Sequence, residues 1–268
     1  MPDPDTDLPL VRIEGRHGTF LTNPNDTYIG RSMLRYGEFS ERELQLLLEL
    51  VGPGAVAVDA GANMGAFTVP LARRVGRSGV VHAIEPQPLV FQQLCANVVF
   101  NGLVNVSAVN AFCGDDARWI PVYRLDPAIE RNLGGLSLAD LAAEEPADVQ
   151  VRIDRLDDMV DPHRLDLVKA DVEGAEIDLL RGALGLIERF RPALYLEHSR
   201  VDRAELQRML GRLRGLGYRF WLHRPPLFNP DNHRGEAHNL FDDLVSHNLL
   251  ALSGRTAPAG FDLEPLSG

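Results

Sequence analysis

The chain alternates between short apolar runs and longer segments whose apolar residues recur every three or four positions. Short apolar runs bounded by turn residues predict buried strands, and the longer segments predict helices. The expected strands are residues 56–60, 80–84, 104–111, 165–170 and 193–196, and the expected helices are 66–75, 89–101, 176–190 and 203–216. Residues 218–223 and 244–252 should close the sheet as an antiparallel pair. This alternation is typical of a mostly parallel sheet covered on both faces, so the sequence predicts a doubly wound, Rossmann-like α/β domain.

Three further segments flank or interrupt this domain. Residues 10–28 have the pattern of short strands separated by turns. A helix is expected to start at Ser40, because Ser40 and Glu43 have the spacing of a capping box, and to end at Gly52-Pro53-Gly54. Between 113 and 156, stretches of alternating apolar residues at 119–123 and 149–153 predict an inserted hairpin or a small antiparallel addition. The expected organisation is an N-terminal region at 1–53, a main domain at 54–252 with an insertion at about 113–156, and a tail at 253–268.

Composition and charge narrow the class of protein. The chain has 268 residues, a formal net charge of −11 and 45% hydrophobic residues, which suits one large domain with a buried core. Nucleic-acid and anionic-membrane surfaces need clustered Lys and Arg, and no such run occurs, so neither partner is expected. The acidic, Pro-rich N-terminus is unlike a signal peptide, and no apolar run approaches the ~18 residues that span a bilayer. Cys95 and Cys113 fit neither a zinc site nor a disulfide framework, so a cytoplasmic protein is expected.

The first chemical motif follows the first strand of the alternating region. Asp59-Ala60-Gly61-Ala62-Asn63-Met64-Gly65 joins this strand to a helix, at the place where open α/β sheets bind ligands. Its two glycines allow a sharp turn and a close approach of a ligand to the backbone. A dinucleotide site would have glycines where Asn63 and Ala66 stand, and a strand-end Asp suits a cationic ligand better than a phosphate. The ammonium and sulfonium groups of S-adenosylmethionine fit such a motif; the alternative is a tight turn without a ligand.

Two acidic segments are expected at the same edge of the sheet. Glu85-Pro86 ends the next strand, where a carboxylate can accept hydrogen bonds from ribose hydroxyls; a plain surface glutamate is the alternative. Residues 169–173 end a predicted central strand, and the period of a strand places Lys169 and Asp171 on one face. The alternative is that Asp171 or Glu173 caps the next helix and pairs with Lys169. Lys169 is the only lysine in the chain, against a background of arginines.

Together these segments resemble the FkbM-type S-adenosylmethionine-dependent methyltransferases. The resemblance runs from about residue 28 to 252 and rests on DAGANMG at 59–65, GLVNV at 102–106, KADVEGAE at 169–176 and NPDNHRG at 229–235. It also includes Tyr36-Gly37-Glu38, Gly134-Gly135 and VSHNLL at 245–250. Alanines at 170 and 175 depart mildly from the family's pattern.

The resemblance implies a Rossmann-like sheet with a reversed last strand, and methyl transfer, usually to an oxygen of a sugar, a polyketide or a related small metabolite. It places Asp59, Ala60, Gly61, Asn63 and Gly65 at the methionine end of the cofactor, Glu85 and Pro86 at the ribose, and Ala111 and Phe112 beside the adenine. Asp171 and Glu173 would face the methyl-transfer site, with Asp171 also at the cofactor. Glu38 would reach the same end, or simply lead into the helix that follows it.

Methylation of a hydroxyl also requires a group that accepts its proton. The candidate bases are Asp171, Glu173 and His198. Lys169 is ranked last, because neighbouring carboxylates oppose the loss of its proton. A divalent metal on Asp171 and Glu173 is an alternative way to activate the hydroxyl, but no fixed spacing indicates one, so no metal ligand is assigned.

Acceptor recognition is assigned to the long polar segment 225–239, since long connections in compact domains are often functional. His233 and Arg234 would then meet an anionic or hydroxylated group of the acceptor.

Two other classes of function compete with methyl transfer. An NAD(P)-dependent oxidoreductase is disfavoured by the missing glycines and by the lack of an evident catalytic Tyr-Lys pair. A non-catalytic binding module of the same fold is disfavoured by acids at the ends of three strands.

Overall fold

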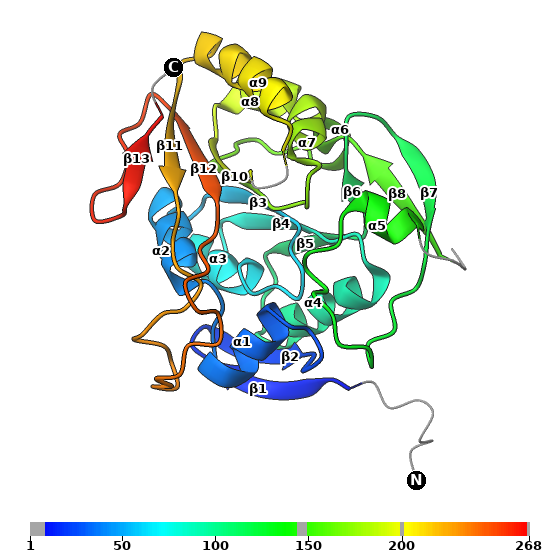
Figure 1. Ribbon diagram of the computed structural model, residues 1–268. Coiled ribbons are helices and arrows are strands. Elements are labelled where there is room, and N and C mark those ends of the chain that lie inside the picture. The colour runs from blue at the N-terminus through cyan, green and yellow to red at the C-terminus, as the bar shows by residue number, and fades with distance from the viewer. Residues whose placement is uncertain (1–8, 144–148, 199–200, 267–268) are drawn as a thin grey trace.

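The computed structural model describes residues 9–143, 149–198 and 201–266, and Figure 1 shows a large twisted sheet at its centre. Its eight strands lie in the order β13-β11-β12-β10-β9-β3-β4-β5. Their bounds are β3 Val56–Ala60, β4 Val80–Ile84, β5 Val106–Val109, β9 Leu167–Ala170, β10 Ala193–Glu197, β11 Tyr218–His223, β12 Asn248–Ser253 and β13 Leu263–Pro265. Strands β5, β4, β3, β9 and β10 are parallel, and β12 is antiparallel to both β10 and β11. The predicted mostly parallel sheet with a reversed strand is therefore confirmed.

Helices cover both faces of this sheet (Figure 1). One face carries α2 Glu41–Leu50, α3 Thr68–Val75 and α4 Pro88–Phe100, and the other carries α6 Leu156–Met159, α7 Glu176–Gly182, α8 Leu184–Phe190 and α9 Arg203–Gly215. Alternate strand residues enter separate cores: Val58 and Val168 pack with α7 to α9, whereas Ala57 and Leu167 pack with α2 and α3. Among the described residues, none of the helices has both the length and the hydropathy to cross a membrane.

The N-terminal region packs against α4. Strands β1 Val11–Gly15 and β2 Gly18–Thr22 form a hairpin, and α1 Ile29–Tyr36 follows. The amide of Asn97 on α4 fixes this hairpin, because its Oδ1 accepts from the Leu21 N–H at 2.6 Å and its Nδ2 donates to the Leu21 carbonyl at 3.1 Å. The hairpin was expected, but α1 was not. This short helix ends at Gly37, whose φ of 72° is readily adopted only by glycine.

The insertion forms a second, three-stranded sheet beside the first. Its strands are β6 Phe112–Cys113, β7 Arg118–Val122 and β8 Val149–Asp154, and it also contains α5 Leu138–Ala143. Strands β7 and β8 pair antiparallel, as predicted. Backbone hydrogen bonds join the insertion to the N-terminal region: Thr27 N–H donates to Arg131 O at 3.1 Å, and Arg131 N–H donates to Asn25 O at 3.0 Å. We call these two linked segments, residues 25–29 and 131–136, the cover.

One predicted helix, 176–190, is interrupted at Ala183, which has ψ near 6° and separates α7 from α8. The expectation of a single helix was wrong for a reason that lies far away in the sequence. The carboxylate of Asp157, on α6, accepts hydrogen bonds from the N–H groups of Gly185 and Leu186 at 3.0 and 2.9 Å. It thereby supplies the first turn of α8 with the cap that a new helix start needs.

The cap of one helix and the structure of the C-terminal segment also differ from the prediction. Helix α2 starts and ends as expected, but Ser40 forms no side-chain cap; its hydroxyl instead donates to the carboxylate of Glu43 at 2.9 Å. The capping box was therefore wrong. The segment expected to be a tail contributes β13, which pairs with β11 at the edge of the sheet.

Candidate active site

A cavity opens where β3, β4 and β9 end, and we call it the first cavity. Its wall residues are Gly61, Asn63, Ile84, Glu85, Pro86, Gln87, Ala111, Phe112, Cys113, Asp171, Val172 and Glu173, closed from above by Ile29, Leu133, Gly134 and Leu136. Residues from the ends of neighbouring parallel strands thus meet around one space, as ligand sites in such sheets do. Seven of the predicted cofactor residues line it, namely Gly61, Asn63, Glu85, Pro86, Ala111, Phe112 and Asp171.

Gly61 brings the loop after β3 against the loop after β9. Its φ is +74°, and a Cβ added there would lie 1.8 Å from the Asp171 carbonyl oxygen. Its N–H and that of Ala62 both donate to the Ile84 carbonyl at 3.0 Å. Only glycine satisfies both the backbone angle and the close approach, so Gly61 sets the shape of the cavity floor.

Glu85 is a buried acid at the end of β4. One carboxylate oxygen accepts from the Asn63 N–H and the other from the Gln87 N–H, each at 2.9 Å. Burial raises the pKa of Glu85 to about 7, although these hydrogen bonds act in the opposite direction. These two hydrogen bonds hold the carboxyl in a single orientation at the cavity wall, where it could accept a hydrogen bond from a ribose hydroxyl.

The lining of the first cavity suits S-adenosylmethionine. Ala111, Phe112 and Leu136 offer an apolar surface for a flat purine, Glu85 offers an acceptor for a ribose, and Asp171 and Glu173 offer negative charge for a cationic end. Neither Lys nor Arg belongs to this lining in the part of the chain that the structure describes. A pyrophosphate would therefore lack a cationic partner, which argues against a dinucleotide in this cavity.

Three other predicted cofactor residues lie behind the cavity wall. Asp59 is fully buried, and its carboxylate accepts from the Thr68 hydroxyl at 2.6 Å. Ala60 packs into the core with α7 to α9. A Cβ on Gly65, whose φ is +93°, would lie 2.9 Å from a methyl of Leu94. These residues shape the loop after β3 but are not among those that line the cavity.

Asp59 belongs to a row of buried polar side chains that crosses three adjacent strands. Asp59 on β3 is in register with Lys169 on β9, which is in register with Tyr195 on β10. The Lys169 Nζ lies 3.2 Å from Asp59 Oδ1 and 3.7 Å from Asp171 Oδ2, and 4.9 Å from the centre of the Phe67 ring. Burial lowers the pKa of Lys169, but the carboxylates of Asp59 and Asp171 outweigh burial and raise it. The lysine therefore stays charged and is no base.

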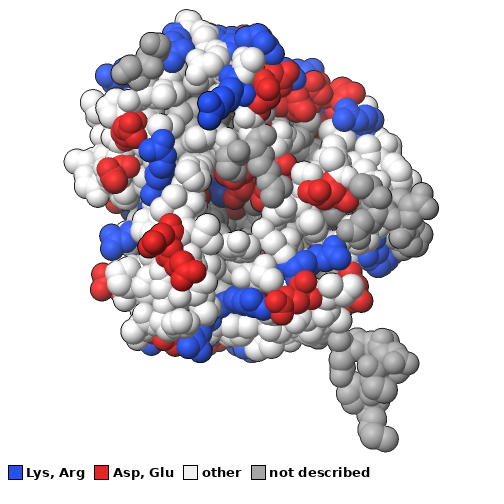
Figure 2. Space-filling view, viewed as in Figure 1, with Lys and Arg blue, Asp and Glu red and all other residues white. Residues whose placement is uncertain are grey.

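A second cavity, of about 190 Å³, adjoins the first. Its lining comprises Tyr28, Ile29, Phe39, Glu43, Phe67, Asn132, Gly134, Asp171, Glu173, Glu197, Leu227, Ser246 and Asn248. Asp171 and Glu173, with Ile29 and Gly134 of the cover, line both cavities. Figure 2 shows a hollow near the middle of the molecular surface in this view, with atoms of Asp or Glu residues visible inside it. Two ligands could thus lie on either side of Asp171 and Glu173.

Glu176 holds the loop that carries these two acids. Its carboxylate accepts from the N–H groups of Val172 and Gly174 at 3.0 and 3.1 Å, and Glu173 adopts a φ of 53° inside this loop. Burial raises the pKa of Glu176 to about 7, and Glu197 adds to the rise. A left-handed φ is costly for a residue with a side chain. The hydrogen bonds of Glu176 therefore maintain a strained backbone at Glu173, where the two cavities meet.

Glu176→Gln should reveal this raised pKa as a pH-dependent stability difference. The folded-state pKa lies above the unfolded value of 4.5, so the carboxyl's contribution is fully present below 4.5 and is lost as the pH rises through about 7. Relative to Glu176→Gln, the wild type should lose up to about 3 kcal/mol over this range. Urea unfolding at several pH values measures it, with Glu188→Gln on the exposed side of α8 as the control. A difference for Glu176→Gln that does not change with pH would contradict the assignment.

His198 does not reach either cavity. Its N–H donates to the His247 carbonyl at 3.0 Å, its ring packs edge-on at 6.2 Å from the His247 ring, and burial lowers its pKa. The residue before it, Glu197, lines the second cavity instead. The prediction of His198 as a base is corrected by this geometry, since successive residues at a strand end point in opposite directions.

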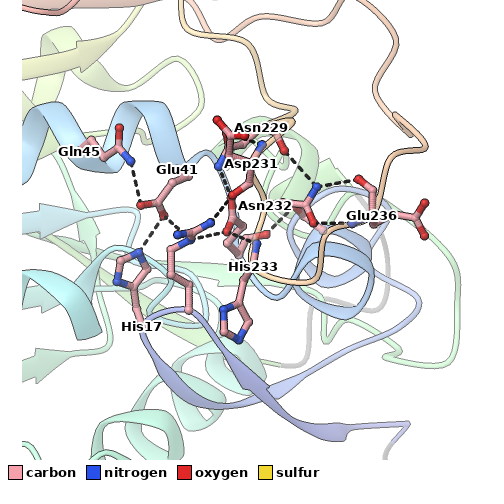
Figure 3. Close-up of polar contacts among 11 residues, drawn as sticks. His17, Glu41, Gln45, Asn229, Asp231, Asn232, His233 and Glu236 are labelled. Carbon is pink, nitrogen blue, oxygen red and sulfur yellow. Dashed lines mark hydrogen bonds and ion pairs between the residues drawn. The ribbon is translucent and has the colours of Figure 1, made fainter.

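Glu38 was expected near the cofactor, and the structure places it elsewhere. Its carboxylate accepts from Arg16 Nε at 2.5 Å, from Asn229 Nδ2 at 2.7 Å and from the His233 N–H at 2.8 Å. The Arg16 guanidinium also donates to the Asp231 carbonyl at 2.5 Å, so residues 229–233 are tied to the N-terminal hairpin and to the turn between α1 and α2. Figure 3 shows His17, Glu41, Asn229, Asp231 and His233 in this region. Glu38 therefore fixes a loop and does not contact either cavity.

The same contacts correct the role expected for segment 225–239. His233 packs beside Gly37, and the Arg234 guanidinium donates to the carbonyl of Glu14 at 3.3 Å. Leu227 is the residue of this segment that lines the second cavity. His233 and Arg234 were predicted to meet the acceptor, but their side chains contact Gly37 and Glu14 of the N-terminal region instead.

Several lining residues of the second cavity were missed from the sequence. Glu43 was read as a capping residue of α2, and Asn132, Ser246 and Asn248 carried no recognised spacing. Asn248 and Ser246 fall within VSHNLL, a segment of the family resemblance, which was the available signal. In the described ranges, the two cavities included, no three His, Cys, Asp or Glu side chains gather in a way that could hold a metal ion.

Known proteins resemble this chain in sequence and fold. Residues 59–220 match the family model described as "Methyltransferase FkbM domain". The 31-O-demethyl-FK506 methyltransferase FkbM of Streptomyces tacrolimicus is 31% identical over 204 residues, covering 66% of this chain and 77% of that protein. Methyltransferase 1 of Beauveria bassiana is 33% identical over 145 residues, covering 47% of this chain and 57% of that protein.

The solved structure of methyltransferase FkbM from Methylobacillus flagellatus has a TM-score of 0.51 at 19% identity, covering 86% of this chain and 48% of that one. This chain thus spans about half the length of two of these relatives. The family model matches more than half of the chain. The chain therefore belongs to the FkbM family of S-adenosylmethionine-dependent methyltransferases.

Proposed function

We propose that this protein transfers a methyl group from S-adenosylmethionine to a hydroxyl oxygen of a small metabolite. The observation that carries the proposal is the junction of two cavities at Asp171 and Glu173. The first cavity would hold the cofactor, and the second would hold the acceptor. Their common wall is where a methyl group would pass from one ligand to the other.

The residues of this chain contribute mainly by position. Bound S-adenosylmethionine supplies an electrophilic methyl group on a sulfonium. Gly61 and Asn63 would face the methionine end, Glu85 the ribose, and Ala111 and Phe112 the adenine. Asp171 would contribute negative charge near the sulfonium while its own charge is balanced by Lys169 at 3.7 Å. Holding both reactants in line lowers the entropy cost of the reaction, and the cover would keep water from the site.

The lining of the second cavity favours a neutral or cationic acceptor that carries hydroxyl groups. Glu43, Asp171, Glu173 and Glu197 make this lining acidic, and no Lys or Arg of the described residues belongs to it. A phosphate or a carboxylate on the acceptor would be repelled. This composition supports a small molecule over a nucleic acid. The name of the Streptomyces relative, a 31-O-demethyl-FK506 methyltransferase, supports oxygen as the attacking atom.

Cofactor binding is tested by calorimetric titration with S-adenosylmethionine, S-adenosylhomocysteine and NAD. Both adenosyl compounds should bind, and NAD should not. Glu85→Ala removes the ribose acceptor, so it should weaken both adenosyl compounds by about 10- to 100-fold, the equivalent of a hydrogen bond to a charged group. Glu49→Ala, on the exposed face of α2, is the control and should bind normally.

Either of two outcomes would overturn the proposal. Binding of NAD without the adenosyl compounds would favour an oxidoreductase. Binding of S-adenosylmethionine without turnover of any acceptor would favour a non-catalytic module. The acceptor panel is methyl glucoside, glucosamine, glucuronate and 31-O-demethyl-FK506, with S-adenosylhomocysteine formation as the readout. The acidic lining predicts that glucuronate is the poorest acceptor of the three sugars.

A further inference from the structure

Glu43 is a buried acid whose side chain lines the second cavity. It lies in the first turn of α2, and 5% of its surface is exposed. The Ser40 hydroxyl donates to Glu43 Oε2 at 2.9 Å, and Ser246, which also lines the cavity, is a second hydrogen-bonding partner. The two serines fix the carboxyl in place while it remains at the cavity wall.

The backbone beside Glu43 is strained. Ser40 has a φ of 43°, in the left-handed region, and it provides no cap for α2. Two other non-glycine residues with left-handed φ, Asn63 and Glu173, line the cavities. Such strain persists where surrounding contacts over-determine it, and it concentrates at functional sites. The Ser40 hydroxyl reaches Glu43 from this strained conformation, so the strain serves the orientation of the carboxyl.

The charges around Glu43 leave its carboxyl without a cation of its own. Lys169 lies 3.2 Å from Asp59 and 3.7 Å from Asp171, and among the described residues Glu43 has no cation within ion-pair distance. Burial is the largest cause that raises the pKa of Glu43, Asp171 adds to the rise, and Lys169, Ser40 and Ser246 oppose it, which leaves the pKa at about 7. Tyr195 of β10 also faces this group, and Glu173 and Glu197 share its cavity.

We propose that Glu43 is the general base, which takes the proton of the acceptor hydroxyl during methyl transfer. The inference rests on the proposed function. As the bond from the acceptor oxygen to the methyl carbon forms, the bond from carbon to sulfur breaks and its electron pair stays on sulfur. The hydroxyl proton passes to an Oε atom of Glu43, which exchanges it with solvent after the product leaves.

Glu43 suits this role better than the acids named from the sequence. Asp171 is already the ion-pair partner of the Lys169 ammonium, 3.7 Å away, whereas Glu43 has no such partner among the described residues. A base is most effective when its pKa is near the operating pH, which is the condition that burial creates at Glu43. Asp171 and Glu173 then act by position and charge at the common wall of the two cavities.

The test compares Glu43→Gln and Glu43→Asp with Glu41→Gln. Glu41 is a matched control, because it is equally buried in the same helical turn but pairs with His17 at 2.7 Å, outside both cavities. Glu43→Gln should lower kcat by about 10²- to 10⁴-fold, with unchanged affinity for S-adenosylhomocysteine. The wild-type kcat/KM should rise with pH to a plateau above about 7. The increase of kcat/KM with pH should be absent in Glu43→Gln. It should be present in Glu43→Asp, which should also retain part of the wild-type activity.

An NMR titration of labelled glutamate carboxyls in the S-adenosylhomocysteine complex provides a second readout that needs no acceptor. The signal missing from Glu43→Gln should titrate near 7, and the signals of Glu85 and Glu176 should remain. Full activity of Glu43→Gln, or titration of Glu43 below about 5, would overturn this inference while leaving the proposed function intact. If the complex forms but no acceptor in the panel reacts, the proposed function fails, and the titration still decides whether Glu43 holds a proton at neutral pH.

Discussion

Lys169→Met should destabilise the protein by about 3–5 kcal/mol, the cost of leaving a buried charge without its partner. The Asp59 side chain is 0% exposed and that of Lys169 is 2% exposed, so water cannot replace the lost ammonium. The Thr68 hydroxyl would be the remaining hydrogen-bond donor to the Asp59 carboxylate among the described residues. Methionine keeps the length and apolar packing of the lysine side chain. The decrease in the free energy of unfolding therefore measures the contribution of the ammonium charge. Urea unfolding at neutral pH measures it.

Two further variants sharpen this measurement. Arg164→Met removes a cation that lies 2.6 Å from Asp166 but is half exposed, and it should cost no more than about 1 kcal/mol. Lys169→Arg should also be less stable than the wild type, although it keeps the positive charge. A planar guanidinium does not fit the space that the ammonium shares with Asp59, Asp171 and the Phe67 ring. A Lys169→Met protein as stable as the wild type would show that the buried ion pair contributes nothing.

Gly61→Ala should combine a loss of stability with a loss of cofactor binding. The added Cβ would lie 1.8 Å from the Asp171 carbonyl oxygen, a backbone atom, in a residue whose φ is +74°. The backbone angle and the overlap each cost about 1–3 kcal/mol, and relief of the overlap requires that the loops after β3 and β9 separate. The cavity floor would move with them. Thermal unfolding and calorimetric titration with S-adenosylhomocysteine measure the two effects.

Gly102→Ala is the matched control for Gly61→Ala. Gly102 has a φ of +63°, but an added Cβ there has no neighbour within 4 Å. It should therefore show the cost of the backbone angle alone, about 1–2 kcal/mol, with normal cofactor binding. Equal behaviour of the two variants would mean that the contact between the two loops has no role in shaping the site.

The sequence predicts the parts of the molecule that depend on local periodicity. The strands β3 and β4 begin and end where the apolar runs do, because their residues face a core on both sides. The break between α7 and α8 could not be predicted from the local sequence, because the residue that caps α8, Asp157, lies on another helix. Ser40 and Glu43 have the spacing of a capping box, but Ser40 adopts a left-handed φ of 43° and its hydroxyl donates to the Glu43 carboxylate instead.

The same division applies to the candidate site. Gly61, Glu85 and Asp171 could be predicted together because the ends of parallel strands share one edge of a sheet. Glu43 and Asn132 reach the second cavity from a helix and an insertion, and no local pattern connects them to those strand ends. Glu38 shows the opposite error: a residue within a family motif was assigned to the cofactor, although its partners are Arg16 and a distant loop.

The cover has a consequence for the order of events in a catalytic cycle. Ile29 and Gly134 line both cavities, and they come from two segments joined by backbone hydrogen bonds between Thr27, Asn25 and Arg131. A displacement of either segment would therefore open both ligand sites at once. Cofactor exchange and acceptor exchange should then depend on the same opening of the cover.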